Sequence, residues 1–139
     1  MKALSFKSFL FSLIVVMNCA FVSAQGENNF IYDTKYENDM MVSKTVFERD
    51  GDTNGLNPKT MYEYKYDALG RIAEKIAYRW DSKQDKWVNN FKMSCVYNDA
   101  NNTVEIDYAK WDNKTKKFDL NTQQQTCSLE DAQSLLAKK

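Results

Sequence analysis

The sequence predicts an all-β protein with a single antiparallel meander sheet of five or six strands and a short C-terminal helix. Two stretches, at about residues 57–87 and 88–118, repeat each other, and each copy follows the pattern strand, turn, strand, turn. The matched positions are Tyr66 and Tyr97, Trp80 and Trp111, and Trp87 and Phe118, which share one offset in the numbering (97 − 66 = 111 − 80 = 118 − 87 = 31). Aromatic residues make up 14% of the chain, which has one Pro and four Gly, and this composition suits long paired strands.

The N-terminal segment, residues 1–24, has the pattern of a secretory signal peptide. Lys2 and Lys7 form a short basic start, and an apolar stretch runs from Phe9 to Val22. Small residues then precede a cleavage site after Ala24, so we expect export to the periplasm or the cell exterior. A membrane anchor is the alternative, but a spanning helix needs about 20 predominantly apolar residues and this run is shorter.

Attachment of a lipid at Cys19 is a second alternative, which Asn18 disfavours because a small residue is wanted there. Without the signal peptide the chain has 115 residues (139 − 24 = 115), enough for one domain with a modest core. It then carries 17 basic residues (19 − 2 = 17) against 19 acidic ones. Because no basic excess remains, we expect no nucleic-acid partner and no membrane association of the mature form.

The mature chain divides into a short N-terminal segment and the β domain. Residues 25–40 are expected to form a tail or an edge strand, and residues 41–139 the antiparallel domain. The first strand of the domain is predicted at Met41–Glu48 and the second at about Lys59–Tyr66. A tight turn follows at Asp67–Gly70, where Asp and Gly suit a type I turn with a bulge.

The third strand is predicted at Arg71–Trp80 and should be half-buried. The residues on its apolar face are Ile72, Ile76, Tyr78 and Trp80. Lys75 and Arg79 fall on the other face, which we expect to be exposed.

The fourth strand is predicted at Trp87–Tyr97 and the fifth at Thr103–Trp111. The two repeats differ in the phase of one aromatic residue. Trp80 is in phase with the apolar residues of its strand, whereas Trp111 is not. Either a bulge near Ala109 restores the phase, or Trp111 faces the opposite side of the sheet. If the copies have diverged in this way, the second copy should hold the exposed aromatic residue.

The sixth strand begins at Phe118, and the pattern changes to helical near the C-terminus. Ser128 and Asp131 have the spacing of a capping box. The apolar residues that could share one helical face are Leu129, Ala132, Leu135 and Leu136. A helix of this length needs tertiary contacts to be stable.

Cys95 and Cys127 are the two cysteines of the mature chain, and an oxidising compartment favours their pairing. In a simple meander they lie on next-nearest strands, which are about 9–10 Å apart. A disulfide needs Cα atoms within about 7 Å. A bridge therefore requires the last segment to fold back, and both the paired and the free state stay open.

The chain lacks most signatures of catalysis. It has no His, no CxxC pair, no glycine-rich phosphate loop and no nucleophile elbow, so we expect neither an enzyme nor a cofactor. A glycosidase-like pair of acids is the alternative. The acids at outward strand positions are Glu63, Glu74, Glu105 and Asp107. A solvated polar face explains them better, because charged residues at outward strand positions are common.

One loop resembles the start of a calcium-binding loop. Asp50, Asp52 and Asn54 alternate as oxygen ligands do in such loops. The twelfth position, which should be a bidentate Glu, is Met61. Turn formation explains the same residues, so we expect no metal site.

Aromatic side chains are the better lead to a function. The aromatic and apolar residues expected on one face are Tyr62, Tyr64, Ile76, Tyr78, Trp80, Trp87, Phe91 and Tyr108. The N-terminal segment, the C-terminal helix or a second copy of the chain is expected to cover this face. A part that stays open could bind a sugar or a protein, and the candidate residues are Trp80, Trp87, Trp111 and Phe118.

The segment from Tyr66 to Ile72 resembles the Y-D-x-x-G-R element of YD-type (Rhs-like) repeats. Together with the signal peptide and the Trp80-Asp81 and Trp111-Asp112 pairs, it is similar to a family of small secreted Bacteroidetes proteins of unknown function. The second copy departs from the pattern, because Asn101 replaces Gly70. The resemblance implies a Gram-negative export route and an all-β fold, and it carries no activity.

The sequence therefore predicts a small exported β-sheet protein that acts as a non-enzymatic binding or interaction module. A protein or a glycan is the expected partner, and a homodimer is a further candidate. A carbohydrate-binding module is the first alternative, and a glycoside hydrolase is the second.

Overall fold

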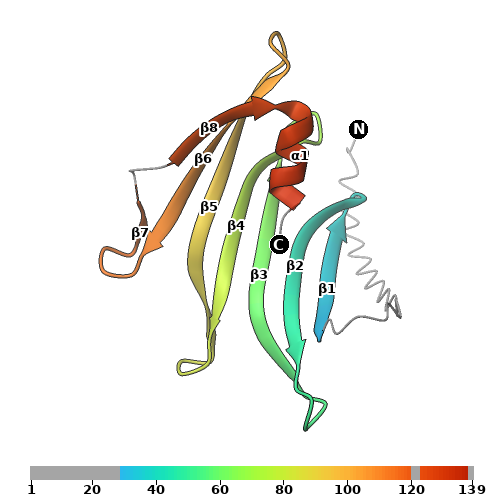
Figure 1. Cartoon of the computed structure of the whole chain (residues 1–139), viewed down its shortest axis with the longest axis vertical. Helices are drawn as coiled ribbons and strands as arrows, with labels where there is room; N and C mark the ends of the chain where they lie inside the picture. The colour runs from blue at the N-terminus through green and yellow to red at the C-terminus, as the bar shows by residue number, and fades with distance from the viewer. Residues whose placement is uncertain (1–28, 120–122, 138–139) are drawn as a thin grey trace, which may run out of the picture.

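The computed structural model describes residues 29–119 and 123–137. The predicted signal peptide lies outside these residues. The described part consists of eight strands and one helix in the order shown in Figure 1. Their bounds are β1 Phe30–Glu37, β2 Met40–Arg49, β3 Leu56–Tyr66, β4 Ile72–Asp81, β5 Lys86–Asn98, β6 Thr103–Asp112, β7 Lys117–Phe118, β8 Gln123–Ser128 and α1 Leu129–Ala137.

The strands form one antiparallel meander, which confirms the predicted fold class with more strands than expected. Strands β1 to β7 follow each other in sequence order across the sheet. Strand β7 pairs with β6 through only two residues. The chain then returns, and β8 pairs with β6 along Thr103–Tyr108, so β7 and β8 share one edge of β6. Strand β1, inside the segment expected to be a tail or an edge strand, forms the opposite edge.

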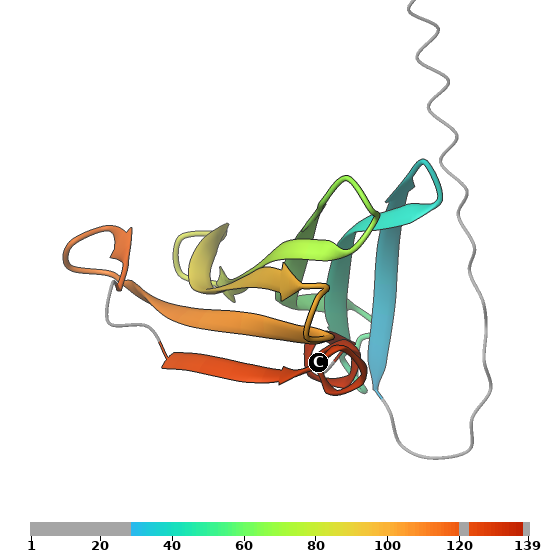
Figure 2. The same ribbon diagram turned by 90° about the horizontal axis from the view of Figure 1, so that it is seen from above.

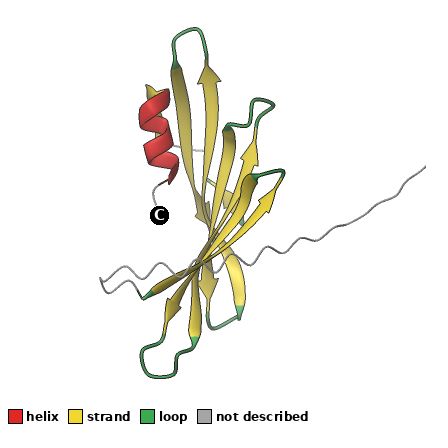
Figure 3. Ribbon diagram, turned by 90° about the vertical axis from the view of Figure 1, so that its right-hand side faces the viewer, coloured by secondary structure: helices red, strands yellow, loops and turns green. Residues whose placement is uncertain are grey.

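The sheet is strongly twisted, and α1 packs against one of its faces. In Figure 2, β1 and β6 run in clearly different directions, and Figure 3 shows the helix on one side of the sheet. The helix begins with a variant of the predicted capping box. The Ser128 hydroxyl accepts from the Asp131 N–H at 3.2 Å, as in a capping box, and it donates to the Asp131 carboxylate at 2.8 Å. We call the side of the sheet covered by α1 the helix face and the other side the open face.

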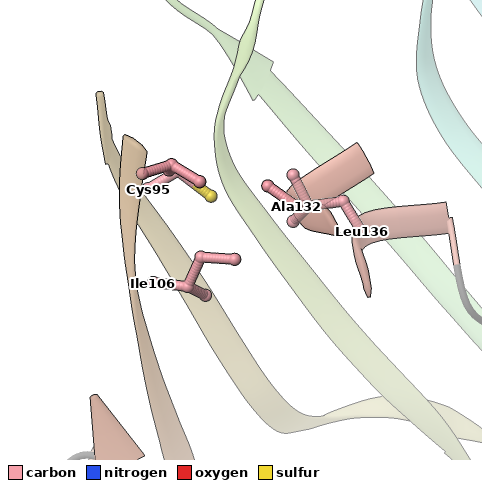
Figure 4. Close-up of a cluster of buried hydrophobic side chains, with 5 residues drawn as sticks. Cys95, Ile106, Ala132 and Leu136 are labelled. Carbon is pink, nitrogen blue, oxygen red and sulfur yellow. The ribbon is translucent and has the colours of Figure 1, made fainter. Parts of the chain in front are cut away.

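The buried residues of the helix face form two clusters. Cys95, Val104 and Ile106 pack against Ala132 and Leu136 of α1, as Figure 4 shows for four of these residues. The second cluster consists of Tyr62, Tyr64 and Ala77. The C-terminal helix thus covers part of the aromatic face, as one of the three alternatives in the sequence analysis had it.

The predicted orientation of β4 is wrong. The prediction placed Ile76 inward and Lys75 outward, but Lys75 is 2% exposed and Ala77 is fully buried. Pairing with the neighbouring strands explains the reversal, because Ala77 lies between Tyr62 of β3 and Phe91 of β5. A small residue between two rings allows close packing, so this face of β4 is the buried one although Ile76 is larger. Ile76 and Tyr78 are half-buried and lie on the open face.

Matching contacts recur along the chain at the predicted offset. The Tyr66 hydroxyl donates to the carbonyl oxygen of Met41 at 2.6 Å, and the Tyr97 hydroxyl donates to that of Ile72 at 2.7 Å. The two donors and the two acceptors are separated by the same offset (97 − 66 = 72 − 41 = 31). Each bond ties the end of a hairpin to its own beginning, in β2–β3 for Tyr66 and in β4–β5 for Tyr97.

The hairpin loops at the other end of the sheet also match, and here the sequence prediction missed a copy. The carboxylates of Asp50, Asp81 and Asp112 each accept the N–H two residues later, at 2.9, 3.0 and 2.8 Å. The three positions follow each other at the offset of the repeat (81 − 50 = 112 − 81 = 31). Asn54 and Lys116, four residues after the first and last Asp, have φ of 55°. The loop at Asp50 is therefore built as the other two are.

Candidate functional site

The four predicted binding residues form two nearly identical aromatic pairs. The rings of Trp80 and Trp87 lie 5.0 Å apart at 70°, and those of Trp111 and Phe118 lie 5.0 Å apart at 72°. Both pairs are directly opposed across neighbouring strands. All four side chains are half-buried, so the expectation that the second copy holds the exposed aromatic residue is wrong.

Both aromatic pairs lie on the open face. The register of β5 and β6 runs without a bulge, so Trp111 points away from Tyr108 and Ile106. Trp80 points away from Ala77, because β4 alternates regularly between them. Trp111 is therefore out of phase because it faces the opposite side of the sheet, and not because of a bulge near Ala109. The edge-to-face geometry is the one that aromatic pairs prefer, and it fixes the register of each hairpin near its loop.

One hollow of the described residues lies on the helix face, between α1 and strands β2 to β5. We call it the α1 groove, and its volume is about 580 Å³. The residues that line it are Met41, Lys44, Tyr64, Tyr66, Gly70, Arg71, Ile72, Tyr97, Leu129, Ala132, Gln133, Leu136 and Ala137. The groove combines apolar side chains, tyrosine rings and two cations, and no carboxylate lines it.

The two cations of the α1 groove differ in their surroundings. The Arg71 guanidinium pairs with Asp67 at 2.8 Å and with Asp99 at 2.5 Å, and it lies over the Tyr97 ring at 4.1 Å. The Lys44 ammonium lies 4.5 Å from the centre of the Tyr32 ring. No salt bridge among the described residues includes Lys44. Lys44 is thus the cation available to a ligand.

A third cation, Lys75, is buried between the sheet and α1. Its ammonium donates to the carbonyl oxygen of Leu136 at 2.9 Å and lies 4.7 Å from the centre of the Tyr62 ring. Burial lowers the pKa of Lys75, and the nearby charge of Lys44 lowers it further. The sequence did not predict that Lys75 points inward. One signal was present: Lys75 follows Lys44 at the offset of the repeat (75 − 44 = 31), which indicates that the two lysines occupy equivalent positions on the same face.

A second, smaller hollow of about 430 Å³ lies beside α1 toward β8. Its lining residues are Met93, Ile106, Tyr108, Gln123, Gln124, Gln125 and Leu135. No charged side chain lines this hollow.

The two cysteines lie on the helix face as free thiols. Cys95 of β5 is opposite Ile106, and Cys127 of β8 is opposite Val104, so β6 runs between them. Burial raises the pKa of the Cys95 thiol, which disfavours the reactive thiolate. A disulfide between them stays a prediction.

The acidic residues serve the loops and the open face. In the loop that resembles a calcium site, the Asp50 carboxylate accepts from the Asp52 N–H and the Thr53 hydroxyl, both at 2.9 Å. The hydrogen bond from Asp52 is the main reason why the pKa of Asp50 is lowered. Across residues 29–119 and 123–137, no three side chains of His, Cys, Asp or Glu form a group suited to a metal ion. These oxygens thus stabilise the turn.

The acids considered for a glycosidase pair lie on the open face. The Glu63 carboxylate accepts from the Tyr78 hydroxyl at 2.7 Å, and Glu74 pairs with Lys65 at 2.7 Å. Glu105 and Asp107 lie on β6 with Ala109, pointing away from the helix. No carboxylate lines either of the two hollows.

No helix in the described part of the chain is long and apolar enough to cross a membrane. The model of a family of unknown function, DUF3836, matches residues 1–128. A comparison with curated proteins gave no match.

Three solved structures are similar. A DUF3836 family protein from Parabacteroides distasonis is 33% identical with a TM-score of 0.68, covering 78% of this chain and 97% of that one. A DUF3836 family protein from Bacteroides vulgatus is 29% identical with a TM-score of 0.66, covering 73% and 100%. A protein of unknown function from Bacteroides fragilis, 22% identical with a TM-score of 0.57 over 65% and 64%, shares the fold. None of these matches is to an Rhs-like protein, so that part of the predicted resemblance is not supported.

Proposed function

This chain belongs to DUF3836, a family of unknown function, and we propose that it is an exported, non-enzymatic binding module that holds its ligand in the α1 groove. The pattern of residues 1–24 supports export. Ligand sites are concave, mostly apolar and equipped with a few polar groups, and the α1 groove has this composition.

The charge of the groove carries the proposal. Lys44 lines it without a salt-bridge partner among the described residues, whereas Arg71 is paired with Asp67 and Asp99. The ammonium of Lys75 is buried close to Lys44. An anionic group would offset the repulsion between the two lysines. Apolar side chains such as Met41, Ile72 and Leu136 would contact the rest of the ligand. The expected ligand therefore joins an apolar body to an anionic group such as a carboxylate.

Calorimetric titration with octanoate, and with octan-1-ol as its neutral counterpart, tests this function. Octanoate should bind, and octan-1-ol should bind about tenfold more weakly or worse, because it lacks the charge that Lys44 would pair with. Lys44→Met should reduce the affinity for octanoate to that for the alcohol. Lys86→Met is the matched control, because Lys86 is exposed at the first position of β5. Equal binding of acid and alcohol by the wild type would refute the anionic requirement.

A second pair of variants tests the groove itself. Gln133 lines the α1 groove from the helix, whereas Ser134 next to it is exposed and lines neither hollow. Gln133→Trp should fill the groove and abolish octanoate binding, and Ser134→Trp should leave it unchanged. If both variants bind octanoate as the wild type does, the ligand site is not the α1 groove.

A carbohydrate-binding role is the second candidate, and one observation favours it. Trp80, Trp87, Trp111 and Phe118 all lie on the face that α1 leaves open, and each keeps part of its surface exposed. Tryptophan rings stack on sugars through such partly exposed faces. Titration of the intrinsic fluorescence with common polysaccharides tests this role, and constant emission throughout would count against it.

A further inference from the structure

Strand β1 forms one edge of the sheet (Figure 1), and exposed aromatic side chains lie along it. Among the described residues, β1 pairs only with β2, so its outer edge has no partner there. Phe30, Tyr32 and Tyr36 of this strand are 43%, 38% and 61% exposed. An edge strand without Pro and with apolar side chains is a template for pairing with another strand.

The backbone of β1 shows which of its groups point outward. The N–H of Arg49 in β2 donates to the carbonyl oxygen of Asn29 at 2.6 Å, so Asn29 directs its backbone polar groups toward β2. By alternation, Ile31, Asp33 and Lys35 do the same, and Phe30, Tyr32 and Thr34 direct theirs outward. The irregularity between β1 and β2 is an extra residue in β2, since Lys35 is opposite Ser43 and Tyr36 is opposite Met41. The outward row of β1 is therefore regular.

We propose that a second copy of this chain binds along this edge, with the two β1 strands antiparallel and Thr34 opposite Thr34 of the other copy. The two-fold axis runs through this pair, perpendicular to the sheet. Thr34 directs its N–H and carbonyl groups outward, so the central pair forms two hydrogen bonds between the copies. The two sheets join into one continuous sheet.

The charges of β1 select this register. With Thr34 on the axis, Asp33 of each copy lies opposite Lys35 of the other, which makes two symmetric ion pairs. These positions do not form hydrogen bonds to each other across the new interface, so their side chains approach closely. If the two-fold axis passed through residue 33 or residue 35 instead, Asp33 would lie opposite Asp33, or Lys35 opposite Lys35. Like charges directly opposed are destabilising.

The aromatic residues fit the same register. Tyr32 of each copy lies opposite Tyr36 of the other, on the helix face, where Asp33 and Lys35 do not project. Tyr36 is the most exposed aromatic residue of β1, and the pairing would cover it. Cross-strand aromatic pairs contribute to sheet stability in addition to the area they bury.

Sedimentation velocity of the purified protein over a wide concentration range tests the proposal, with three charge variants. The wild type should dimerise. Asp33→Lys and Lys35→Asp should each weaken the dimer about tenfold or more, because each turns two ion pairs into two like-charge pairs. The double variant with both substitutions restores opposite charges and should dimerise within about threefold of the wild type. Circular dichroism checks that every variant folds.

Three outcomes would overturn the proposal. A wild type that stays monomeric at all concentrations excludes the second copy, and binding of an extended peptide to that monomer would identify another occupant of the edge. A dimer that both single variants leave unchanged lies elsewhere on the surface. A double variant as weak as the single ones shows that Asp33 and Lys35 do not face each other.

Discussion

The ammonium of Lys75 donates a 2.9 Å hydrogen bond to the carbonyl oxygen of Leu136, and so joins the centre of the sheet to the last turn of α1. The final carbonyl groups of a helix lack partners within the helix and carry partial negative charge. A cation at this end satisfies one of them and interacts favourably with the helix dipole. The same contact requires a charged group to be almost completely buried, which is costly.

Lys75→Met should therefore remove a pH dependence of the stability. Burial lowers the pKa of Lys75 from its ordinary 10.5, so between the two values the unfolded state binds more protons than the folded state. The free energy of unfolding should then rise with pH on approaching 10.5, and it should fall as the pH drops through the lowered pKa. Urea unfolding of both proteins at a series of alkaline pH values measures the difference.

The comparison between the two proteins isolates Lys75, because tyrosine ionisation contributes equally to both. Near pH 7 the Met variant should be within about 1 kcal/mol of the wild type, since the lost hydrogen bond and the relieved burial of charge oppose each other. Lys86→Met, at an exposed site, should keep the wild-type pH dependence. Parallel curves for the wild type and Lys75→Met would contradict the prediction.

Tyr66→Phe and Tyr97→Phe should have similar effects on stability. Each removes one hydroxyl that donates to a backbone carbonyl, of Met41 or Ile72, and leaves the ring in place. We expect each to lower the free energy of unfolding by about 1 kcal/mol. Tyr36→Phe is the control, because Tyr36 is 61% exposed and its variant should match the wild type. A loss confined to one of the two hairpin variants would show that the matched bonds are not equivalent.

Replacement of Asp50 and Asp112 by Asn should weaken the loss of stability in acid. Hydrogen bonds from the N–H groups of Asp52 and Lys114 are the main cause that lowers the pKa of the two carboxyls below 3.8. Stability from these carboxylates is present above pH 3.8 and is lost as the pH falls through the lowered pKa values.

Asn keeps the turn hydrogen bond but does not titrate. The double Asn variant should therefore lose less stability between neutral and acid pH than the wild type does. Acid titration followed by circular dichroism measures this. Asp52→Asn is the matched control, because the Asp52 carboxylate is exposed in the same loop. An acid limb as steep in the double variant as in the wild type would contradict the role of these carboxylates.

The meander could be predicted because turn residues and alternation are local signals. Tyr62 and Tyr64 alternate with Glu63 and Lys65, and β3 buries the tyrosines as the pattern indicates. The orientation of β4 could not be predicted in this way. Its burial depends on Tyr62 and Phe91 of the neighbouring strands and on α1, which are contacts distant in sequence.

The candidate sites likewise combine features that are local in the sequence with contacts between residues far apart in it. The pairing of Trp80 with Trp87 is local, because the two residues flank one short loop, and the sequence named both as candidate binding residues. The α1 groove joins Lys44 of β2 to Gln133 of α1, which no spacing rule connects. Lys75 was assigned to the exposed face because a charged residue at a strand position is usually solvated. The helix carbonyl that accepts its hydrogen bond lies 61 residues further along the chain (136 − 75 = 61).

The two aromatic pairs should differ in what they stabilise, although their geometries match. Strand β7 pairs with β6 through two residues, so the contact of Trp111 with Phe118 holds a short, weakly attached segment. Trp111→Ala should therefore speed hydrogen exchange at the Asp119 N–H, which donates to the carbonyl oxygen of Lys110 at 2.8 Å, by about tenfold. The global free energy of unfolding should change little. Trp80 belongs to the long strand β4 and faces Trp87 of the long strand β5, so Trp80→Ala should lower the global free energy of unfolding by about 1 kcal/mol or more. Val96→Ala, at a site 61% exposed, should alter neither measurement. Equal global losses in the two Trp variants would show that the β6–β7 hairpin unfolds only together with the whole sheet.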